Sequence, residues 1–127
     1  MATADVLVYV AGAVLVAWGA AHIVATRPVL TLYGDLSTDN RRVWVMEWVA
    51  EGFTHIFVGL LVVVVTALEG AAGSGSGVVY RSCAAFELVL VAWTAATGAR
   101  TPYVWYRICL VVLSVVAALL LIASVVA

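Results

Sequence analysis

Lysine is absent from this chain of 127 residues, and charged residues of every kind are few. Charged side chains make up 10% of the chain, whereas soluble domains average about 25%. A water-soluble protein with so little charge would expose large apolar patches and aggregate. The net charge of −1 provides no basic surface for nucleic acid, so we expect no nucleic-acid partner.

Cysteine and proline are scarce as well, with two residues of each. Cys83 and Cys109 show none of the short spacings of metal or redox motifs. Both lie in predicted helices, where we expect them to be small buried residues. Pro28 and Pro102 mark helix boundaries, because proline disfavours helical geometry in the preceding residue and suits the first position of a helix.

Long apolar stretches dominate instead, and 66% of the residues are hydrophobic. About 20 helical residues cross the ~30 Å hydrocarbon core of a bilayer. Four stretches have this length, and their short connections favour antiparallel neighbours. We therefore predict an all-α fold, an integral membrane four-helix bundle in up-down-up-down order, as one domain over residues 1–127. Thr38 or Asp39 is the expected N-cap of the second span and Thr101 that of the fourth. The predicted spans are residues 5–25, 39–68, 78–97 and 102–126.

The arginines are distributed unevenly around these spans. Arg27, Arg41, Arg42 and Arg100 flank one side of the membrane, and only Arg81 flanks the other. Connections rich in arginine remain in the cytoplasm. We therefore predict a multi-pass protein of the cell membrane, with both termini outside and the first and third connections in the cytoplasm.

Ionisable residues inside the spans are the most informative feature, because each costs about 2.5–3.5 kcal/mol at the bilayer centre. Glu47, Glu51 and His55 follow one another at intervals of four residues in the second span. They fall within about 80° of one another around the helix. Such a stripe must face other protein or water rather than lipid.

Each of the other spans has polar residues that can meet this stripe. Glu87 lies on the third span, Trp18 and His22 lie on the first, and Tyr103 and Arg107 begin the fourth. Depths estimated at about 1.5 Å per residue predict a funnel that is open to the cytoplasm. Its mouth carries His22, Glu47 and Arg107. Its floor carries Glu51, His55 and Glu87.

Three carboxylates in this funnel accompany one arginine and two histidines. Carboxylates crowded in a low dielectric do not all ionise, so we expect at least one glutamate to be protonated at neutral pH. The deepest one, Glu87, is the expected acid. A protonated carboxylic acid near an ionised one is used in acid–base catalysis, and intramembrane carboxyl groups are also used in proton transport.

The leading prediction is a small membrane enzyme that isomerises, cyclises or hydrates an apolar or lipid-like substrate. Glu87 would donate the proton, Glu51 would be the base, and His55 would relay the proton or orient a carboxylate. Glu47 completes the catalytic set, and Arg107 would fix a polar or anionic head group. The remaining substrate-binding residues are expected to be His22, Trp18, Trp48, Trp93 and Tyr103.

Two other classes of function remain open at this stage. One is a proton- or cation-coupled transporter subunit, which would have to form a homo-oligomer because four spans are few for a transport path. The other is a structural or assembly subunit of a membrane complex, in which the polar residues would form interhelical hydrogen bonds. Membrane lipids are expected partners in every case.

Metal binding is a further alternative for the same residues. Glu51 and His55 are spaced i, i+4, and Glu87 or His22 would complete a ligand set. Carboxylate metal sites in bundles use Glu-x-x-His twice, whereas this chain has one pair with another spacing. We expect no cofactor; if a metal is bound, its ligands are His55, Glu51 and Glu87. Haem is disfavoured because His22 and His55 are predicted to lie about two to three turns apart in depth.

The first span contains Gly12 and Gly19, seven positions apart, which allow another helix to approach closely. This span ends in GAAH, and with four short spans it resembles small bacterial and archaeal membrane proteins of the DoxX-like kind. The stretch from Asp39 to Gly52 (DNRRVWVMEWVAEG) is similar to other four-span membrane proteins. The resemblance implies the four-span architecture and no particular chemistry.

Overall fold

The computed structural model describes residues 2–127, and this part of the chain consists of helices and short connections. The long helices are α1 (Thr3–Val24), α3 (Thr38–Glu69), α4 (Ser76–Ala96) and α5 (Val104–Val126). The short helices are α2 (Thr26–Leu30), η1 (Thr31–Tyr33) and η2 (Gly98–Arg100). The all-α bundle expected from the sequence is therefore confirmed.

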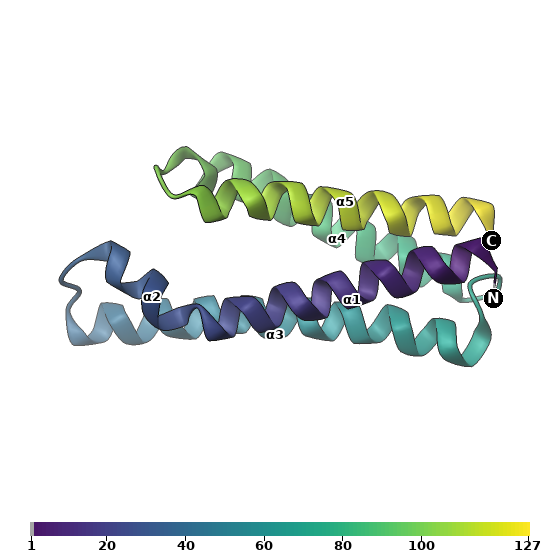
Figure 1. Cartoon of the computed structure of the whole chain (residues 1–127), viewed down its shortest axis with the longest axis horizontal. Helices are drawn as coiled ribbons and strands as arrows, with labels where there is room; N and C mark the ends of the chain where they lie inside the picture. The colour runs from purple at the N-terminus through teal and green to yellow at the C-terminus, as the bar shows by residue number, and fades with distance from the viewer. Residues whose placement is uncertain (1) are drawn as a thin grey trace.

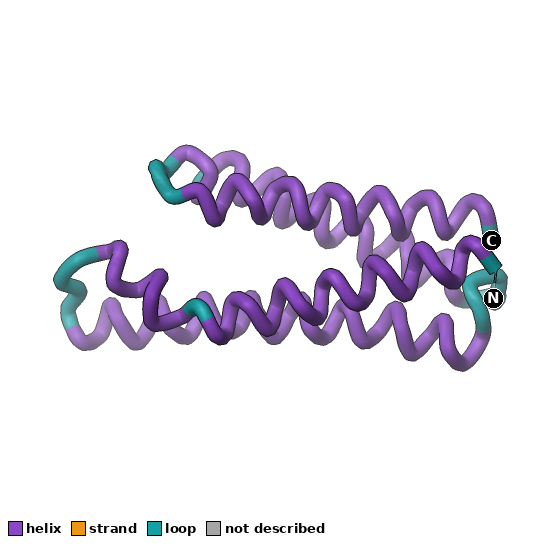
Figure 2. Tube along the Cα trace, viewed as in Figure 1, coloured by secondary structure: helices purple, strands orange, loops and turns teal. Residues whose placement is uncertain are grey.

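The four long helices form two pairs (Figure 1). α1 packs along α3, α4 packs along α5, and α1 also contacts α5, whereas α3 and α4 contact each other over a short length. Both termini and the turn between α3 and α4 lie at the end where the pairs converge (Figures 1 and 2). α2 and the connection between α4 and α5 lie at the opposite end, where the pairs are separated.

Four glycines bring the backbones of α1 and α3 together. A Cβ atom on Gly12 would lie 2.9 Å from the Gly59 carbonyl oxygen, and one on Gly59 would lie 2.7 Å from the Gly12 oxygen. Gly19 and Gly52 oppose each other in the same way. Cβ atoms do not approach oxygen this closely, so larger residues here would separate the helices. Small residues serve this purpose in bilayers, where apolar lipid provides no hydrophobic force between helices.

The apolar core lies where the two helix pairs converge. Its fully buried side chains include Val8, Leu15, Val62, Tyr80, Ala84, Leu113, Val116 and Leu120. The one polar group of Tyr80 is satisfied, because its hydroxyl lies 2.6 Å from Thr66 Oγ1, which itself donates to the Val62 carbonyl. At the same end, the Asp5 carboxylate accepts the backbone N–H of Ala71 at 2.9 Å. This bond fixes the α3–α4 turn to the start of α1.

The outer surface of the bundle is apolar. Every long helix carries large hydrophobic side chains that are more than half exposed, among them Val24, Phe53, Phe57, Val89, Val111 and Val125. Such a surface is unfavourable in water and suits hydrocarbon. Within residues 2–127, four helices are long and apolar enough to cross a membrane. The fold therefore fits a small multi-pass membrane protein.

The start of α3 differs from the expected one. Its N-cap is Ser37, whose Oγ accepts the Asn40 backbone N–H at 3.2 Å, and not Thr38 or Asp39. An N-cap side chain bonds the amide three residues on, and Ser37 is placed to do this. The helix therefore begins with a serine cap one residue before Thr38, the first of the two expected positions.

The start of α5 also differs. α5 begins at Val104, so Pro102 is not its first residue. Thr101 does not cap α5, because its Oγ1 donates back to the Gly98 carbonyl at 2.6 Å and closes η2 instead. Pro28 does not end α1 either, since it lies in the first turn of α2, where the missing N–H has no cost.

Replacing Gly52 with alanine tests the contact between α1 and α3. The added Cβ would lie 2.9 Å from the Gly19 carbonyl oxygen and 3.2 Å from His22 Cβ. We expect Gly52→Ala to lower the free energy of unfolding by about 2 kcal/mol, as overpacking does, in an SDS titration of mixed micelles. Gly77→Ala is the matched control, because its Cβ would meet only the flexible end of Arg81 at 3.4 Å. Equal losses in the two variants would contradict this packing.

Candidate functional site

Four ionisable side chains from α1, α3 and α4 form the His–Glu row, which consists of His22, Glu51, His55 and Glu87. His22 Nε2 lies 4.0 Å from Glu51 Oε1, and His55 Nε2 lies 3.8 Å from the same oxygen. His55 Nδ1 lies 3.6 Å from Glu87 Oε2. The structure therefore joins His22 to the three residues that were expected at the floor of the funnel.

The convergence of the two histidines follows from the direction of helical side chains. Gly12 lies opposite Gly59 and Gly19 lies opposite Gly52, so α1 and α3 run antiparallel, and each side chain leans toward the N-terminus of its own helix. His22 and His55 therefore lean toward each other, and their ring centroids are 5.8 Å apart. The expected separation of two to three turns was wrong because it used backbone positions alone. One oxygen of the Glu51 carboxylate lies within 4.0 Å of the Nε2 atom of each ring.

The inner half of the row is fully buried. His55 and Glu87 have no exposed surface, whereas 35% of the Glu51 side chain is accessible. Among residues 2–127, neither ring nitrogen of His55 and neither carboxyl oxygen of Glu87 has a hydrogen-bond partner. Each such buried group costs about 1–3 kcal/mol. A proton between His55 and Glu87 would offset this cost by forming a hydrogen bond, so the pair is suited to holding one.

His22 is held in place from two directions. Its Nδ1 lies 3.2 Å from the Trp18 carbonyl oxygen; because that oxygen can only accept, Nδ1 carries the proton. Trp48 Nε1 donates to the His22 carbonyl at 2.7 Å, and the two rings stack with centroids 4.6 Å apart. His22 Nε2 is therefore directed toward Glu51.

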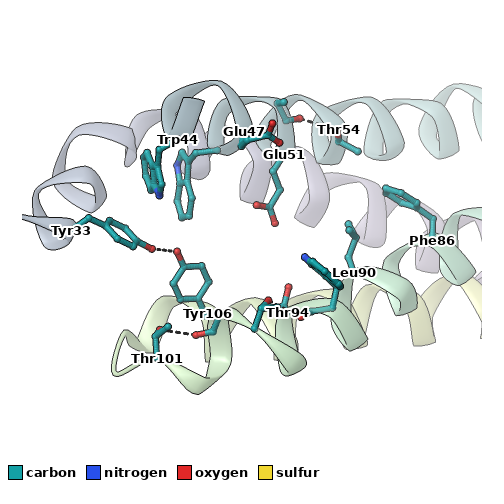
Figure 3. A pocket seen from close by; sticks show the side chains of 15 residues that line it. Tyr33, Trp44, Glu47, Glu51, Thr54, Phe86, Leu90, Thr94, Thr101 and Tyr106 are labelled. Atoms are coloured by element: carbon teal, nitrogen blue, oxygen red, sulfur yellow. Dashed lines mark hydrogen bonds between the residues drawn. The ribbon is translucent and has the colours of Figure 1, made fainter. Parts of the chain in front are cut away.

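A cavity of about 730 Å³ opens between α3 and α4, and we call it the α3–α4 cavity. Figure 3 shows Glu51 extending into it from α3, with Phe86, Leu90 and Thr94 on the opposite wall. Trp93 also contributes to the wall formed by α4. The volume lies in the range of small-molecule sites, and the cavity exists because α3 and α4 contact each other over only a short length.

A second cavity, of about 410 Å³, lies between α1 and α5, and we call it the α1–α5 cavity. Trp18, His22 and Cys109 line it, together with residues of α2. Both cavities are lined by Trp48, Glu51 and Tyr106. The exposed part of the His–Glu row, Glu51, is therefore accessible from two spaces.

Two tyrosine contacts close the separated end of the bundle. The hydroxyl of Tyr33 in η1 is hydrogen-bonded to that of Tyr106 in α5 (Figure 3). The Tyr103 hydroxyl donates to the Leu32 carbonyl at 2.7 Å. These bonds connect the α2–η1 segment to α5 across the mouth of both cavities. Tyr106 was expected in the aromatic wall of the funnel, whereas Tyr33 was not among the predicted site residues, because no periodic pattern connects a turn residue to a helix so distant in sequence.

The predicted site residues fall into three groups. Those that line a cavity are Glu47, Glu51, Trp18, His22, Trp48 and Trp93. His55 and Glu87 lie buried behind Glu51. Tyr103 and Arg107 line neither cavity.

Arg107 is not at the mouth of a funnel, contrary to the sequence-based expectation. It is exposed, whereas its neighbour Tyr106 lines both cavities. Successive side chains point about 100° apart around a helix. Tyr106 and Cys109 therefore point into the bundle from α5, and Arg107 points outward. An arginine is therefore not available to bind an anionic head group in either cavity.

The His–Glu row does not have the form of a metal site. Across residues 2–127, no three or more His, Cys, Asp or Glu side chains are arranged to hold a metal ion. Glu51, His55 and Glu87, the alternative ligand set, contact one another in succession rather than around one centre. This geometry suits the transfer of a proton from one member to the next.

Comparisons of this chain with protein-family models, curated proteins and solved structures give no match. The DoxX-like resemblance of the sequence remains a prediction. The function is therefore inferred from the geometry of the site.

A double-mutant cycle tests the buried pair. His55→Leu leaves the Glu87 carboxyl buried without its facing imidazole, and Glu87→Met leaves the His55 Nδ1 without its facing carboxyl while Nε2 still faces Glu51. We expect each single variant to lose about 3 kcal/mol of unfolding free energy. The double variant should lose clearly less than the sum, because neither polar group remains. Additive losses, measured by SDS titration, would show that the two side chains do not interact.

Proposed function

We propose that this protein is a small membrane enzyme that performs acid–base chemistry on an apolar or lipid-like molecule bound against Glu51. The position of Glu51 carries this proposal. It lines both cavities and lies within 4.0 Å of a nitrogen of both His22 and His55. A general base must reach its substrate, and Glu51 combines that access with proton-binding groups behind it.

In this proposal Glu51 exchanges a proton with the substrate. His55 passes the proton between Glu51 and Glu87, the innermost member of the row. The sequence alone favours Glu87 as the direct proton donor, but its full burial behind His55 favours a role as proton store. Glu47 lines the α3–α4 cavity one turn before Glu51 and supplies a second carboxylate to that space.

An isomerisation or a cyclisation suits this site better than a hydration. Each of these two reactions takes a proton from one carbon and returns a proton to another, so no co-substrate is consumed. The His–Glu row would hold the proton between the two steps. Hydration would instead consume a water molecule as a second substrate, which would have to be held beside Glu51.

Substrate access in this proposal is lateral, from the bilayer. The Tyr33–Tyr106 and Tyr103–Leu32 bonds close the end of the bundle. Both cavities lie between helices whose outer faces are apolar. A hydrophobic molecule dissolved in lipid therefore reaches Glu51 without passing through water. In the same proposal the protein lies in the cell membrane, with its arginine-rich end in the cytoplasm.

A proton-coupled transporter subunit is the second candidate. It is favoured by one observation, that Glu51 lines two cavities between different helix pairs. A carboxylate accessible from two spaces can carry a proton or cation from one to the other. This candidate requires a homo-oligomer, so a monomer at every protein concentration in detergent, measured by light scattering, would argue against it.

Deuterium exchange tests the enzyme proposal. The purified protein in lipid nanodiscs is incubated in D2O with a total extract of apolar membrane lipids, which is then analysed by mass spectrometry. We expect the wild-type protein to introduce deuterium at carbon in one class of lipid. Glu51→Gln should reduce this rate by about 100-fold or more, because acid–base groups contribute about 10²–10⁴-fold to catalysis.

Asp35→Asn is the control for this experiment, because it removes an exposed carboxylate that lines neither cavity. It should keep the wild-type rate. Deuterium incorporation that Glu51→Gln leaves unchanged, or none by the wild-type protein, would contradict the enzyme proposal.

A further inference from the structure

The charge lining the α3–α4 cavity is of one sign. Glu47 and Glu51 both line this cavity, and the described residues around it include no arginine, lysine or histidine. His22 lies on the side of the α1–α5 cavity, and His55 is fully buried. Arg107 is exposed outside both cavities. A ligand in the α3–α4 cavity therefore meets two carboxylates, and the basic side chains nearest to Glu51, His22 and His55, are not part of the cavity lining.

The Glu51 carboxylate has capacity to bind a further group. None of the hydrogen bonds formed within residues 2–127 involves it, and its contacts with His22 and His55 are 4.0 and 3.8 Å long. On the inner side, the fully buried ring of His55 directs an unpartnered Nε2 toward it. On the outer side, Glu51 extends into the α3–α4 cavity (Figure 3).

Aromatic rings line the same cavity as this carboxylate, together with four threonines. Six of the lining residues of the α3–α4 cavity are aromatic: Tyr33, Trp44, Trp48, Phe86, Trp93 and Tyr106. Trp44 and Trp48 stack with centroids 5.1 Å apart and His22 also stacks on Trp48, so the rings most open to a ligand are those of Phe86, Trp93 and Tyr106. Aromatic faces attract cations, most strongly where water is excluded, and cages of such rings bind quaternary ammonium groups.

We propose that the α3–α4 cavity binds an apolar molecule that carries a positive charge, a tertiary or quaternary amine with hydrocarbon substituents, with Glu51 as its counter-ion. An anion would be repelled by the two carboxylates, and a neutral hydrocarbon would gain nothing from them. This inference rests on the proposed function in that it assigns the substrate class of the same site.

Two ions of equal shape and opposite charge provide the test. Tetraphenylphosphonium is a large apolar cation, and tetraphenylborate is an anion of the same size. Binding of each to the full-length protein is measured by equilibrium dialysis in a neutral detergent, with empty micelles subtracted. We expect saturable binding of the cation with one site per chain, and at least tenfold weaker binding of the anion.

Substitutions at Glu51 locate the site. Glu51→Gln should raise the dissociation constant of tetraphenylphosphonium on the order of tenfold or more, because the counter-ion is lost. Glu51→Asp keeps the charge and should bind within a few-fold of the wild-type protein. Asp35→Asn removes an exposed carboxylate outside the cavity and should bind the cation with wild-type affinity.

A second pair of variants keeps the proposal testable if Glu51→Gln does not fold. Trp93 is 69% exposed and lines the α3–α4 cavity, whereas Phe57 is 65% exposed and lines neither cavity. Trp93→Leu should weaken cation binding a few-fold through loss of one ring. Phe57→Leu should leave cation binding unchanged.

Equal binding of the two ions, or cation binding that neither Glu51→Gln nor Trp93→Leu weakens, would overturn the inference. The outcome is separate from that of the deuterium experiment. Glu51-dependent exchange into neutral lipids without cation binding would support the enzyme and reject this substrate class. Cation binding that depends on Glu51, without any exchange, would support the ligand class and reject the enzyme.

Discussion

The backbone contact between α1 and α3 is the constraint on which the rest of the structure depends. Gly12 opposes Gly59 and Gly19 opposes Gly52. The carbonyl oxygen of each glycine lies too close to its partner for that partner to carry a Cβ atom. This contact sets both the distance and the register of the two helices. In that register Trp48 reaches the His22 carbonyl, and a single oxygen of Glu51 lies within 4.0 Å of a nitrogen of each histidine. A wider contact would separate His22 from Glu51.

The two ends of the bundle differ in packing: one end contains the apolar core and the other contains the two cavities. At the converged end, Tyr80 and the aliphatic side chains around it are fully buried, and the Asp5–Ala71 bond fixes the turn. At the separated end, the helix pairs leave two cavities, and a hydrogen bond from Tyr33 of η1 to Tyr106 connects η1 to α5 there. The closely packed end thus supports a site whose inner polar groups, His55 and Glu87, lack hydrogen bonds within the described part of the chain.

The sequence predicts much of the fold and part of the site. Four apolar stretches are enough to predict an all-α bundle, and the spacing of Glu51 and His55 is enough to place them on one face. The depth of His22 was not predictable from residue counts, because it depends on the register of α1 and on the lean of its side chain. The position of Arg107 was predicted wrongly, because a shift of one residue along a helix moves a side chain about 100° around its axis. The place of Tyr33 in the site depends on a contact between η1 and α5, which no local sequence pattern indicates.

Glu51 connects the two histidines, and His55 in turn contacts Glu87. The chain contains only two histidines, so ¹⁵N NMR of histidine-labelled protein in nanodiscs resolves both rings. Single histidine substitutions would assign their signals. We expect Glu51→Gln to shift the ring-nitrogen signals of both His22 and His55, whereas Glu87→Gln should shift those of His55 and leave those of His22 unchanged. Signals of His22 that do not respond to Glu51→Gln would show that Glu51 does not contact His22.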